Sequence, residues 1–436
     1  MVFLQNAWWL LVLIGVMILI HELGHYWAAR FFDVKVDAFS FGFGPRLFGF
    51  RRGETDFRFS LFLLGGYVKM AGEQAGDETA SDPRSFQAKP RWQRLIVLFA
   101  GPAMNVVLAV ALLTGLFMVR FPKFAYADGA ATIGYVRADS PAAKAGLRAG
   151  DTIVQIDGVR DPKWVDILMK EAAGAGRALN IGYVRNGQRL QTSVTPILDP
   201  KGIGSAGWEE DTDVLVYAVR SGMDAERAGL QRGDEIVSVD GKPIRSIAVL
   251  HNVIRESEGK PVELVYRRNG QQQSVSVTPK FSDVDGGRWL IGVDLERRVV
   301  MTKLGFAAAL RESVDQNIKG ALLIYQYLEG LIERRMSPKS IEGPIGIARL
   351  SGAAAREGPL AFIGLMAMIS LNLAVFNLLP IPILDGGGIL MLLIEMIMRR
   401  DLSLQVKEAV FKVGMVFLMV VVVFVFYNDI SKLFPG

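Results

Sequence analysis

The sequence predicts a multi-pass α-helical membrane protein that carries two inserted α/β modules. Hydrophobic residues make up 51% of the 436-residue chain. Four segments are long and apolar enough to cross a bilayer, and a more polar segment between them repeats itself. The chain has no cysteine, which excludes disulfides, thiol catalysis and Cys-ligated zinc. The net charge of +5 fits the basic cytoplasmic loops of a membrane protein, and no basic cluster with interleaved aromatics indicates nucleic acid.

Four transmembrane helices are expected at residues 7–32, 95–119, 360–398 and 410–427. The first segment has no basic n-region and no A-x-A cleavage site, so it is a retained span and not a signal peptide. The third is unusually long and is interrupted by glycine and proline. The first and third also contain polar groups, which a helix surrounded by lipid would avoid.

Lysine and arginine are concentrated between the first two spans and in the short connection between the last two. The positive-inside rule therefore places both termini, and the large segment 120–359, outside the cytoplasm. Residues 304–332 are fairly apolar but contain five charged side chains. We expect an amphipathic helix on the membrane surface there. A fifth span at this place would instead move the C-terminus inside.

An internal repeat occupies the segment outside the membrane. Ala145-Gly146-Leu147 recurs 83 residues later as Ala228-Gly229-Leu230, and the same offset relates Asn186-Gly187 to Asn269-Gly270. Short β-branched runs end in Asp-Gly turns, the Asn-Gly pairs predict hairpins, and a helix is expected after each Asp-Gly turn, at 164–173 and 247–257. The predicted domains are 1–119, 128–199, 211–281, 298–358 and 359–436.

The repeated pattern resembles PDZ domains, in the strand order used by bacterial periplasmic proteases. PDZ domains take extended peptide ends by adding them to a sheet as a further strand. The two modules therefore either bind peptide C-termini or act only as bulk that shields or spaces other parts of the protein. The sequence leaves both alternatives open.

A metal-binding motif lies within the first span. His21-Glu22-Leu23-Gly24-His25 is an HExxH sequence, which puts two imidazoles one turn apart on the same face of a helix and a carboxylate beside them. This is the spacing that one Zn²⁺ requires. The alternative is a helix end with two satisfied histidines. Ionisable groups inside a membrane span are costly, however, and usually functional.

A catalytic zinc site needs a third protein ligand. The other histidine, His251, falls in the second repeat, where a surface or core position is expected. Without cysteine the ligand should be a carboxylate, and Asp33 and Asp37 follow His25 too closely. Asp385 lies in the broken third span, where irregular backbone is tolerated only if it lines a cavity or is buried in protein. Glu395, near the basic end of the span at Arg399 and Arg400, is the weaker candidate and is expected to form an ion pair at the membrane interface.

HELGH in the first span and LPIPILDGG in a late span, on either side of a PDZ-like pair, resemble the site-2 protease family of intramembrane zinc metalloproteases. The resemblance covers essentially the whole chain. It implies that one zinc ion is bound by His21, His25 and Asp385, and that Glu22 is the general base. The family often has His or Arg after LDGG where this chain has Gly388. That position is not a ligand, so the departure affects local packing only.

The same resemblance implies a set of substrate-binding positions. A GxG loop matches Gly42-Phe43-Gly44, and a membrane-associated β-hairpin whose edge strand pairs with substrate matches Phe59–Met70. A polar motif of the second span matches Gly101–Asn105. The full set of substrate-binding residues is Gly42, Gly44, Leu61, Leu63, Gly65, Gly66, Tyr67, Asn377, Pro380 and Pro382.

Each of these positions also has a structural alternative. Residues 59–70 could form an ordinary two-stranded hairpin, and the motif that ends at Asn105 could merely shape the second span. Asn377 could make a helix–helix hydrogen bond within the membrane.

The resemblance implies an enzyme that cleaves transmembrane segments of single-span proteins in regulated intramembrane proteolysis. Its partners would be transmembrane-helix substrates and the lipid bilayer of a bacterial inner membrane, with the active site toward the cytoplasmic side. An anti-sigma factor and signal-peptide remnants would be substrates, and the PDZ pair would control their access. Two other functions remain open, a membrane-anchored PDZ adaptor without zinc and a metal transporter with a polar path through several spans.

Overall fold

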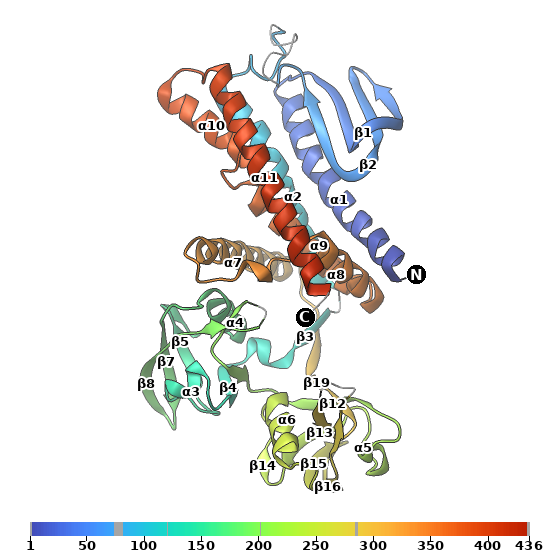
Figure 1. Ribbon diagram of the computed structural model, residues 1–436, viewed down its shortest axis with the longest axis vertical. Coiled ribbons are helices and arrows are strands. Elements are labelled where there is room, and N and C mark those ends of the chain that lie inside the picture. The colour runs from blue at the N-terminus through green and yellow to red at the C-terminus, as the bar shows by residue number, and fades with distance from the viewer. Residues whose placement is uncertain (1, 74–81, 120, 201, 284–286, 434–436) are drawn as a thin grey trace. The chain divides into compact units, whose positions relative to one another are not determined.

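The computed structural model describes residues 2–73, 82–119, 121–200, 202–283 and 287–433. The chain forms two compact units (Figure 1). The membrane unit consists of Met1–Phe121, Lys303–Tyr325 and Ile341–Gly436. The module unit consists of Pro122–Thr302 and Gln326–Ser340.

Within the described ranges, four helices are long and apolar enough to span a membrane. They are α1 (Val2–Phe31), α2 (Arg91–Met118), α9 (Pro359–Asn377) and α11 (Leu404–Leu433). This confirms the expected four-span fold. The amphipathic helix α7 (Phe306–Ile332) is not among the four, and Ser313 in its first half donates to the Val110 carbonyl of α2 at 2.8 Å. Helix α8 (Pro344–Glu357) precedes α9.

The expected third span is two helices, α9 and α10 (Asp385–Met398), separated by an irregular segment at 378–384. Pro380 and Pro382 have no amide hydrogen and cannot continue a helix. Ile383 adopts a φ of 87°, a left-handed conformation that a β-branched residue rarely adopts. The break is therefore enforced by the sequence, and it makes Asp385 the first residue of a new helix.

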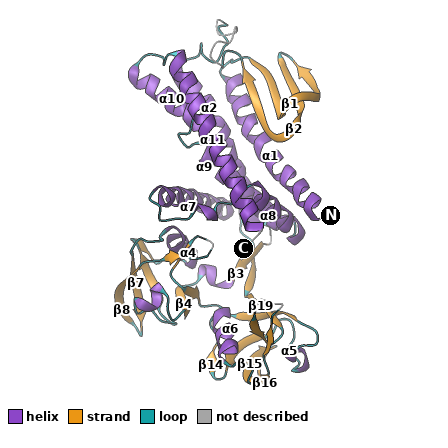
Figure 2. Ribbon diagram, in the orientation of Figure 1, coloured by secondary structure: helices purple, strands orange, loops and turns teal. Residues whose placement is uncertain are grey.

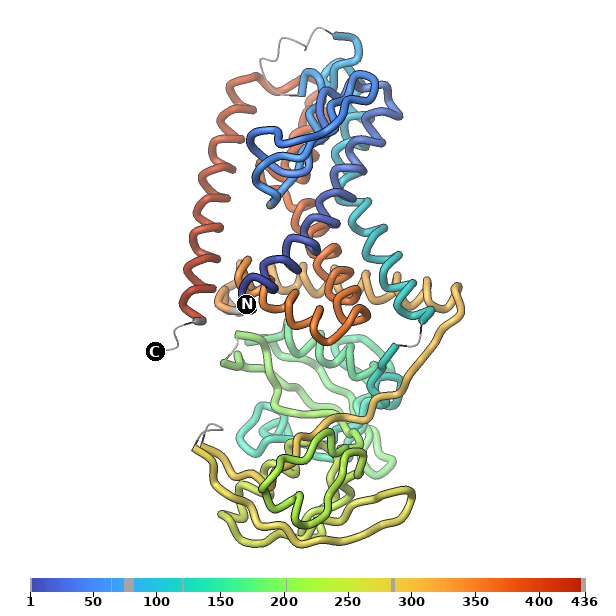
Figure 3. The backbone as a smooth tube through the Cα atoms, turned by 90° about the vertical axis from the view of Figure 1, so that its right-hand side faces the viewer, coloured from blue at the N-terminus to red at the C-terminus, as the bar shows by residue number. Residues whose placement is uncertain are grey.

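The hairpin is larger than expected from 59–70. Strands β1 (Val36–Arg52) and β2 (Thr55–Met70) both bend, so that the first half of β1 lies between the two halves of β2. Phe39, for example, pairs with Val68 on one side and with Phe57 on the other. The second half of β2 is consequently an edge, and in the described part of the chain no strand other than β1 pairs with it. Figures 1 and 3 show the hairpin beside the C-terminal half of α1.

The bend in β1 is at the predicted GxG position, which lies inside the strand and not in a loop. Gly42 and Gly44 have φ values of 96° and 86°, which glycine adopts readily and other residues rarely. A Cβ at Gly42 would also lie 2.9 Å from the Phe62 carbonyl oxygen. A side chain larger than hydrogen would therefore disturb the bend.

The two α/β modules, whose helices and strands Figure 2 distinguishes by colour, have matching strand orders. We name them PDZ1 and PDZ2, and their sheets run β11-β4-β5-β7-β8 and β16-β15-β13-β12-β19. The bounds in PDZ1 are β4 Ala131–Val136, α3 Pro141–Lys144, β5 Thr152–Ile156, β6 Val159–Arg160, α4 Trp164–Ala173, β7 Leu179–Arg185, β8 Gln188–Val194, β9 Ile197–Leu198, β10 Gly204–Ser205 and β11 Trp208–Glu210. Those in PDZ2 are β12 Val214–Val219, α5 Asp224–Arg227, β13 Glu235–Val239, β14 Lys242–Pro243, α6 Ile247–Glu256, β15 Val262–Arg268, β16 Gln271–Val277, β17 Lys280–Ser282, β18 Arg288–Leu290 and β19 Val293–Arg297.

The structure confirms the helices expected at 164–173 and 247–257 and the two Asn-Gly hairpin turns. A buried Asp–Arg pair is also duplicated, Asp151 with Arg185 and Asp234 with Arg268, each at 2.7 Å. One of the two edge strands of each sheet, β11 in PDZ1 and β19 in PDZ2, comes from the segment after the expected domain. At the base of the insertion, β3 (Phe121–Phe124) pairs with β20 (Val299–Thr302). Short 3₁₀ helices occupy Ala125–Asp128 and Pro338–Ser340.

Glu395 belongs to a buried ion cluster at one end of the membrane unit. Its side chain is 1% exposed. It accepts from Lys407 Nζ at 2.8 Å, from the Leu402 amide at 3.0 Å and from Arg94 Nη2 at 3.5 Å. The expected ion pair is therefore present. It is buried inside the membrane unit, and does not lie at the membrane interface as expected. It links α2 to α10, the helix that begins with Asp385.

We predict that Glu395→Ala destabilises the protein by about 3–5 kcal/mol, because Arg94 and Lys407 lose the buried carboxylate with which both pair. Glu408→Ala is the matched control, since the 51% exposed Glu408 side chain pairs with the exposed Lys412 and exposed pairs contribute under about 1 kcal/mol. Thermal unfolding in detergent measures both variants. Equal losses in the two variants would contradict a structural role for the buried pair.

Candidate metal centre

Three side chains converge at the break between α9 and α10. His21 Nε2 and His25 Nε2 on α1 are 3.2 Å apart, and Asp385 reaches them with Oδ2 at 3.2 Å from His21 and Oδ1 at 3.4 Å from His25. Ligand atoms on a tetrahedral zinc ion are separated by about 3.4 Å, given metal–ligand bonds of about 2.0–2.2 Å. The two imidazole nitrogens and the Asp385 carboxylate, which turns a different oxygen toward each histidine, are therefore separated by distances close to those between ligands of one zinc ion. Among the described residues, this is the one group of His and acidic side chains close enough to bind a metal.

The outer ring nitrogen of each histidine also faces a polar group. His25 Nδ1 lies 2.8 Å from the Val97 carbonyl oxygen, to which it can donate. That bond leaves the Nε2 lone pair free for a metal. His21 Nδ1 lies 3.3 Å from the side-chain amide of Asn105. Asn105 Oδ1 is buried, and no donor in the described residues reaches it.

Rotating the Asn105 amide by half a turn would place Oδ1 against His21 Nδ1. The oxygen would then accept the Nδ1 hydrogen and free His21 Nε2 to bind a metal. The partnerless Oδ1 is therefore explained if the histidines are metal ligands. The residues present fit zinc, and Asn105 has a role that the sequence motif did not specify.

Glycines allow the helices to approach closely enough to form this centre. A Cβ at Gly24 would overlap the Ala100 carbonyl of α2, and one at Gly101 would overlap the His25 ring. Gly386 and Gly387 pack in the same way against backbone carbonyls of the 378–384 segment. At Gly388 a Cβ would lie 2.9 Å from Leu98. The side chain of Leu98 thus occupies the space beside Gly388.

Glu22 lies between the three ligands and the edge of β2. Its Cγ would be 3.1 Å from a Cβ at Gly66, and its carboxylate interacts with the backbone of Val68. It is also close enough to His21, His25 and Asp385 for electrostatic interaction with all three. A proton-accepting group therefore faces both the candidate metal position and the open strand edge.

A hollow of about 710 Å³ lies next to Asp385 and Val68. It is lined by the end of β2 (Tyr67–Met70), by Pro382–Asp385, and by side chains of α2, α10 and α11. Tyr67 and Pro382, both predicted from sequence, line it, whereas Asn377 ends α9 and Pro380 lies in the irregular segment. Leu61 and Leu63 are exposed, and Gly65 packs under the Phe43 ring.

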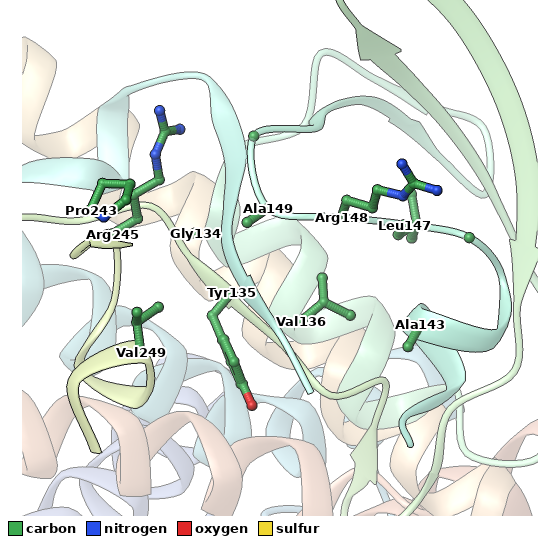
Figure 4. Close-up of a pocket in the computed structure, with 12 residues that line it drawn as sticks. Gly134, Tyr135, Val136, Ala143, Leu147, Arg148, Ala149, Pro243, Arg245 and Val249 are labelled. Carbon is green, nitrogen blue, oxygen red and sulfur yellow. The ribbon is translucent and has the colours of Figure 1, made fainter. Parts of the chain in front are cut away.

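Some residues of this centre were not predicted from the sequence. Val68 and Met70 line the hollow, and Val97 orients His25. Val97 acts through its backbone carbonyl, which leaves no signal in the side-chain pattern. A second hollow, in the module unit, contains no histidine or carboxylate and does not resemble a metal site (Figure 4). His251 lies on α6 of PDZ2, outside the cluster of ligands.

Comparisons with known proteins agree with this geometry. The profile of Peptidase family M50 matches residues 9–421. A "Putative zinc metalloprotease" of Xylella fastidiosa is 32% identical, over 98% of this chain and 99% of the relative. "Regulator of sigma-E protease RseP" of Escherichia coli is 29% identical, over 97% and 98% of the two chains.

Among solved structures, two PDZ domains of SdrC-like proteins match part of the chain. The one from Listeria monocytogenes is 24% identical with a TM-score of 0.18, and it covers 20% of this chain and 90% of that domain. The one from Listeria innocua is 27% identical with a TM-score of 0.17, and it covers 19% and 92%. The full-length matches confirm the family resemblance inferred from HELGH and LDGG. The chain belongs to Peptidase family M50 and is a membrane zinc metalloprotease.

Proposed function

We propose that this protein cleaves the transmembrane segments of single-span proteins within the bilayer. The observation that carries this proposal is the position of Glu22, between the three metal-ligand candidates and the unpaired edge of β2. A water-activating group, a metal site and a strand edge that can hold an extended peptide are thus adjacent. All three lie among helices that are apolar enough to cross a membrane.

His21, His25 and Asp385 would hold the zinc ion, which when bound would supply a Lewis acid for the scissile carbonyl and lower the pKa of water. Glu22 takes the proton of the attacking water and passes it to the nitrogen of the leaving amine. Val97 and Asn105 keep the two imidazole rings oriented through their outer nitrogens.

The substrate must unwind before it is cut, because the carbonyls of a helix are already hydrogen-bonded. The edge of β2 from Phe62 to Met70 offers main-chain groups that can pair with an extended segment, with little demand on its sequence. Tyr67 and Pro382 line the space beside this edge. The remaining positions proposed to contact or shape the substrate path are Gly42, Gly44, Leu61, Leu63, Gly65, Gly66, Asn377 and Pro380.

The active site is proposed to face the cytoplasm from a bacterial inner membrane. The ligands lie in the C-terminal third of α1 and beside the N-terminal half of α2, which begins at Arg91. This is the end of the bundle where Arg94 and Lys407 also lie, so the positive-inside rule points it inward. The termini and the PDZ pair are then outside.

The proposed substrates are single-span proteins that have already been trimmed outside the membrane. An anti-sigma factor fits this description, in line with relatives named regulators of sigma-E protease. Signal-peptide remnants fit it as well. The PDZ pair would restrict access, so that substrates with intact outer domains are not cut.

We predict that Glu22→Gln retains zinc but lowers cleavage of a transmembrane substrate by about 10²- to 10⁴-fold, the usual contribution of a general base. Metal analysis and proteolysis of the purified protein in detergent measure the two properties. His251→Gln is the control and should change neither. Normal cleavage by Glu22→Gln would refute the role of Glu22. Absence of cleavage by the wild-type protein would favour an adaptor or a transporter over a protease.

We predict that Asp385→Asn lowers the zinc content well below one ion per chain, because the amide is a much poorer ligand than the carboxylate. Glu408→Gln is the matched control, since Glu408 lines the same hollow and its side chain is 51% exposed. It should retain zinc. Full zinc occupancy in the Asp385 variant would eliminate this residue as a ligand.

We predict that replacing residues 125–298 with a short Gly/Ser linker permits cleavage of substrates whose outer domains are intact. The deletion keeps β3 and β20, which pair at the base of the insertion, so the ends of the membrane unit stay together. Cleavage of trimmed and untrimmed forms of one substrate is compared. If untrimmed substrates remain uncut, the modules are not what excludes them.

A further inference from the structure

The open edge of β2 ends in a turn that folds back on the strand. Met70 is the last residue of β2, and the turn Met70–Glu73 is closed by a hydrogen bond from the Glu73 amide to the Met70 carbonyl at 3.4 Å. Gly72, the third residue of the turn, has a φ of 64°, which glycine adopts readily at this position. The turn therefore returns Glu73 to the end of the strand.

The main-chain groups of Met70 belong to the open edge and not to the pairing of β2 with β1. Met70 lies opposite Val36, and the next residue, Ala71, donates to the Lys35 carbonyl at 2.9 Å. In an antiparallel ladder such a bond flanks a non-hydrogen-bonded pair, whose own amide and carbonyl groups point away from the partner strand. Both groups of Met70 are therefore directed at the position that an added strand would occupy.

Glu73 occupies both of these groups. Its amide donates to the Met70 carbonyl, and its carboxylate Oε2 accepts from the Met70 amide at 3.3 Å. A residue of an added antiparallel strand would make the same two bonds, one from its amide and one to its carbonyl. Glu73 thus takes the place of a substrate residue at the end of the edge, with a carboxylate oxygen where the substrate carbonyl would be.

The carboxylate of Glu73 lacks a cationic partner. Among the described residues no lysine or arginine forms an ion pair with it, and it interacts electrostatically with Glu22, His25 and Asp385 of the metal centre. The side chain is exposed and lines the same hollow as Asp385. A carboxylate held by one amide hydrogen bond can be exchanged for a substrate carbonyl at little net cost, since that amide is bonded in both states.

The distance along β2 indicates which part of a substrate would meet Glu73. Glu22 interacts with the backbone of Val68, so the scissile bond is expected beside Val68. Met70 is two residues farther along the strand, which corresponds to about 7 Å. A substrate residue two or three positions from the scissile bond would therefore lie against Glu73.

The charge at this end of the membrane unit indicates what kind of residue that is. Arg94 and Lys407 also line the hollow, and both already pair with Glu395. They mark the end of the bundle that is proposed to face the cytoplasm. Single-span proteins have most of their flanking lysine and arginine on that side of the membrane. A basic substrate side chain is thus the complement that Glu73 lacks.

We propose that Glu73 selects substrates that carry a lysine or arginine two or three residues from the scissile bond, on its cytoplasmic side. Without substrate, Glu73 closes the end of the β2 edge. An entering segment displaces the carboxylate from Met70, and the basic side chain of the segment becomes its ion-pair partner. The inference rests on the proposed function, because it assumes that β2 holds the segment that is cut.

The test compares charge variants of the full-length protein with charge variants of one substrate. The substrate is a designed single-span protein with one Gly-Pro break in its apolar span, and mass spectrometry locates its cleavage site. Lysine, glutamine or glutamate is then placed at the second or third residue on the cytoplasmic side of that site. Values of kcat and KM are measured in detergent for the wild type, Glu73→Gln and Glu73→Lys. Glu408→Gln is the matched control, since Glu408 lines the same hollow but pairs with Lys412.

The wild type should cleave the lysine substrate with a kcat/KM about fivefold above that of the glutamine substrate, mainly through KM. Glu73→Gln should cleave the two alike, Glu73→Lys should prefer the glutamate substrate, and Glu408→Gln should keep the wild-type preference. Equal cleavage of all substrates by the wild type, an unchanged preference in Glu73→Lys, or a lost preference in Glu408→Gln would overturn the inference alone. Absence of any cleavage by the wild type would overturn the proposed function, and the inference with it.

A second measurement tests the displacement itself, in case the charge reversal impairs folding. Glu73→Ala removes the carboxylate from the Met70 amide, so an entering segment has nothing to displace there. This variant should lower the KM of the glutamine substrate by a larger factor than it changes kcat, and its zinc content shows whether the metal centre is intact. An unchanged or raised KM at full zinc content would show that Glu73 does not compete with the substrate.

Discussion

The approach of Asp385 to the two histidines of α1 is the constraint on which the membrane unit depends. A carboxylate among apolar helices is stable only with a cation or several donors nearby. The break at 378–384 delivers Asp385 to this position, and the glycines at the α1–α2 crossing let His25 reach it. At the other end of α10, Glu395 is bonded to α2 and to the start of α11. The helix that carries the third ligand is thus fixed at both ends by buried charge.

How well the sequence predicts the structure depends on whether the signal is local. The HExxH spacing, the prolines of the third span and the repeated Asn-Gly turns each act within a few residues, so they predicted helices, a break and hairpins that the structure confirms. The shortage of histidine and cysteine left Asp385 as the third-ligand candidate. The approach of Asp385 to His21 and His25 agrees with that choice.

Contacts between segments distant in the chain could not be predicted in the same way. Val97 orients His25 through a carbonyl group, which every residue possesses. The first half of β1 pairs with both halves of β2 because the hairpin bends at Gly42. The alternation of side chains along the strands does not specify the direction of this bend. The positions of β11 and β19 could not be predicted either. A short strand joins a sheet because of the strand that lies beside it in the fold, and its own composition does not identify that neighbour.

An unpaired strand edge captures extended peptides with little selectivity, which suits the end of β2 because unwound substrates differ in sequence. The same lack of selectivity means that main-chain contacts along this edge cannot by themselves reject a wrong substrate. Selection must therefore also act before a segment reaches β2, and the proposed restriction of access by the duplicated modules is such a step. Both modules keep the same buried support for their fold, because the Asp151–Arg185 pair of the first copy recurs in the second as Asp234–Arg268.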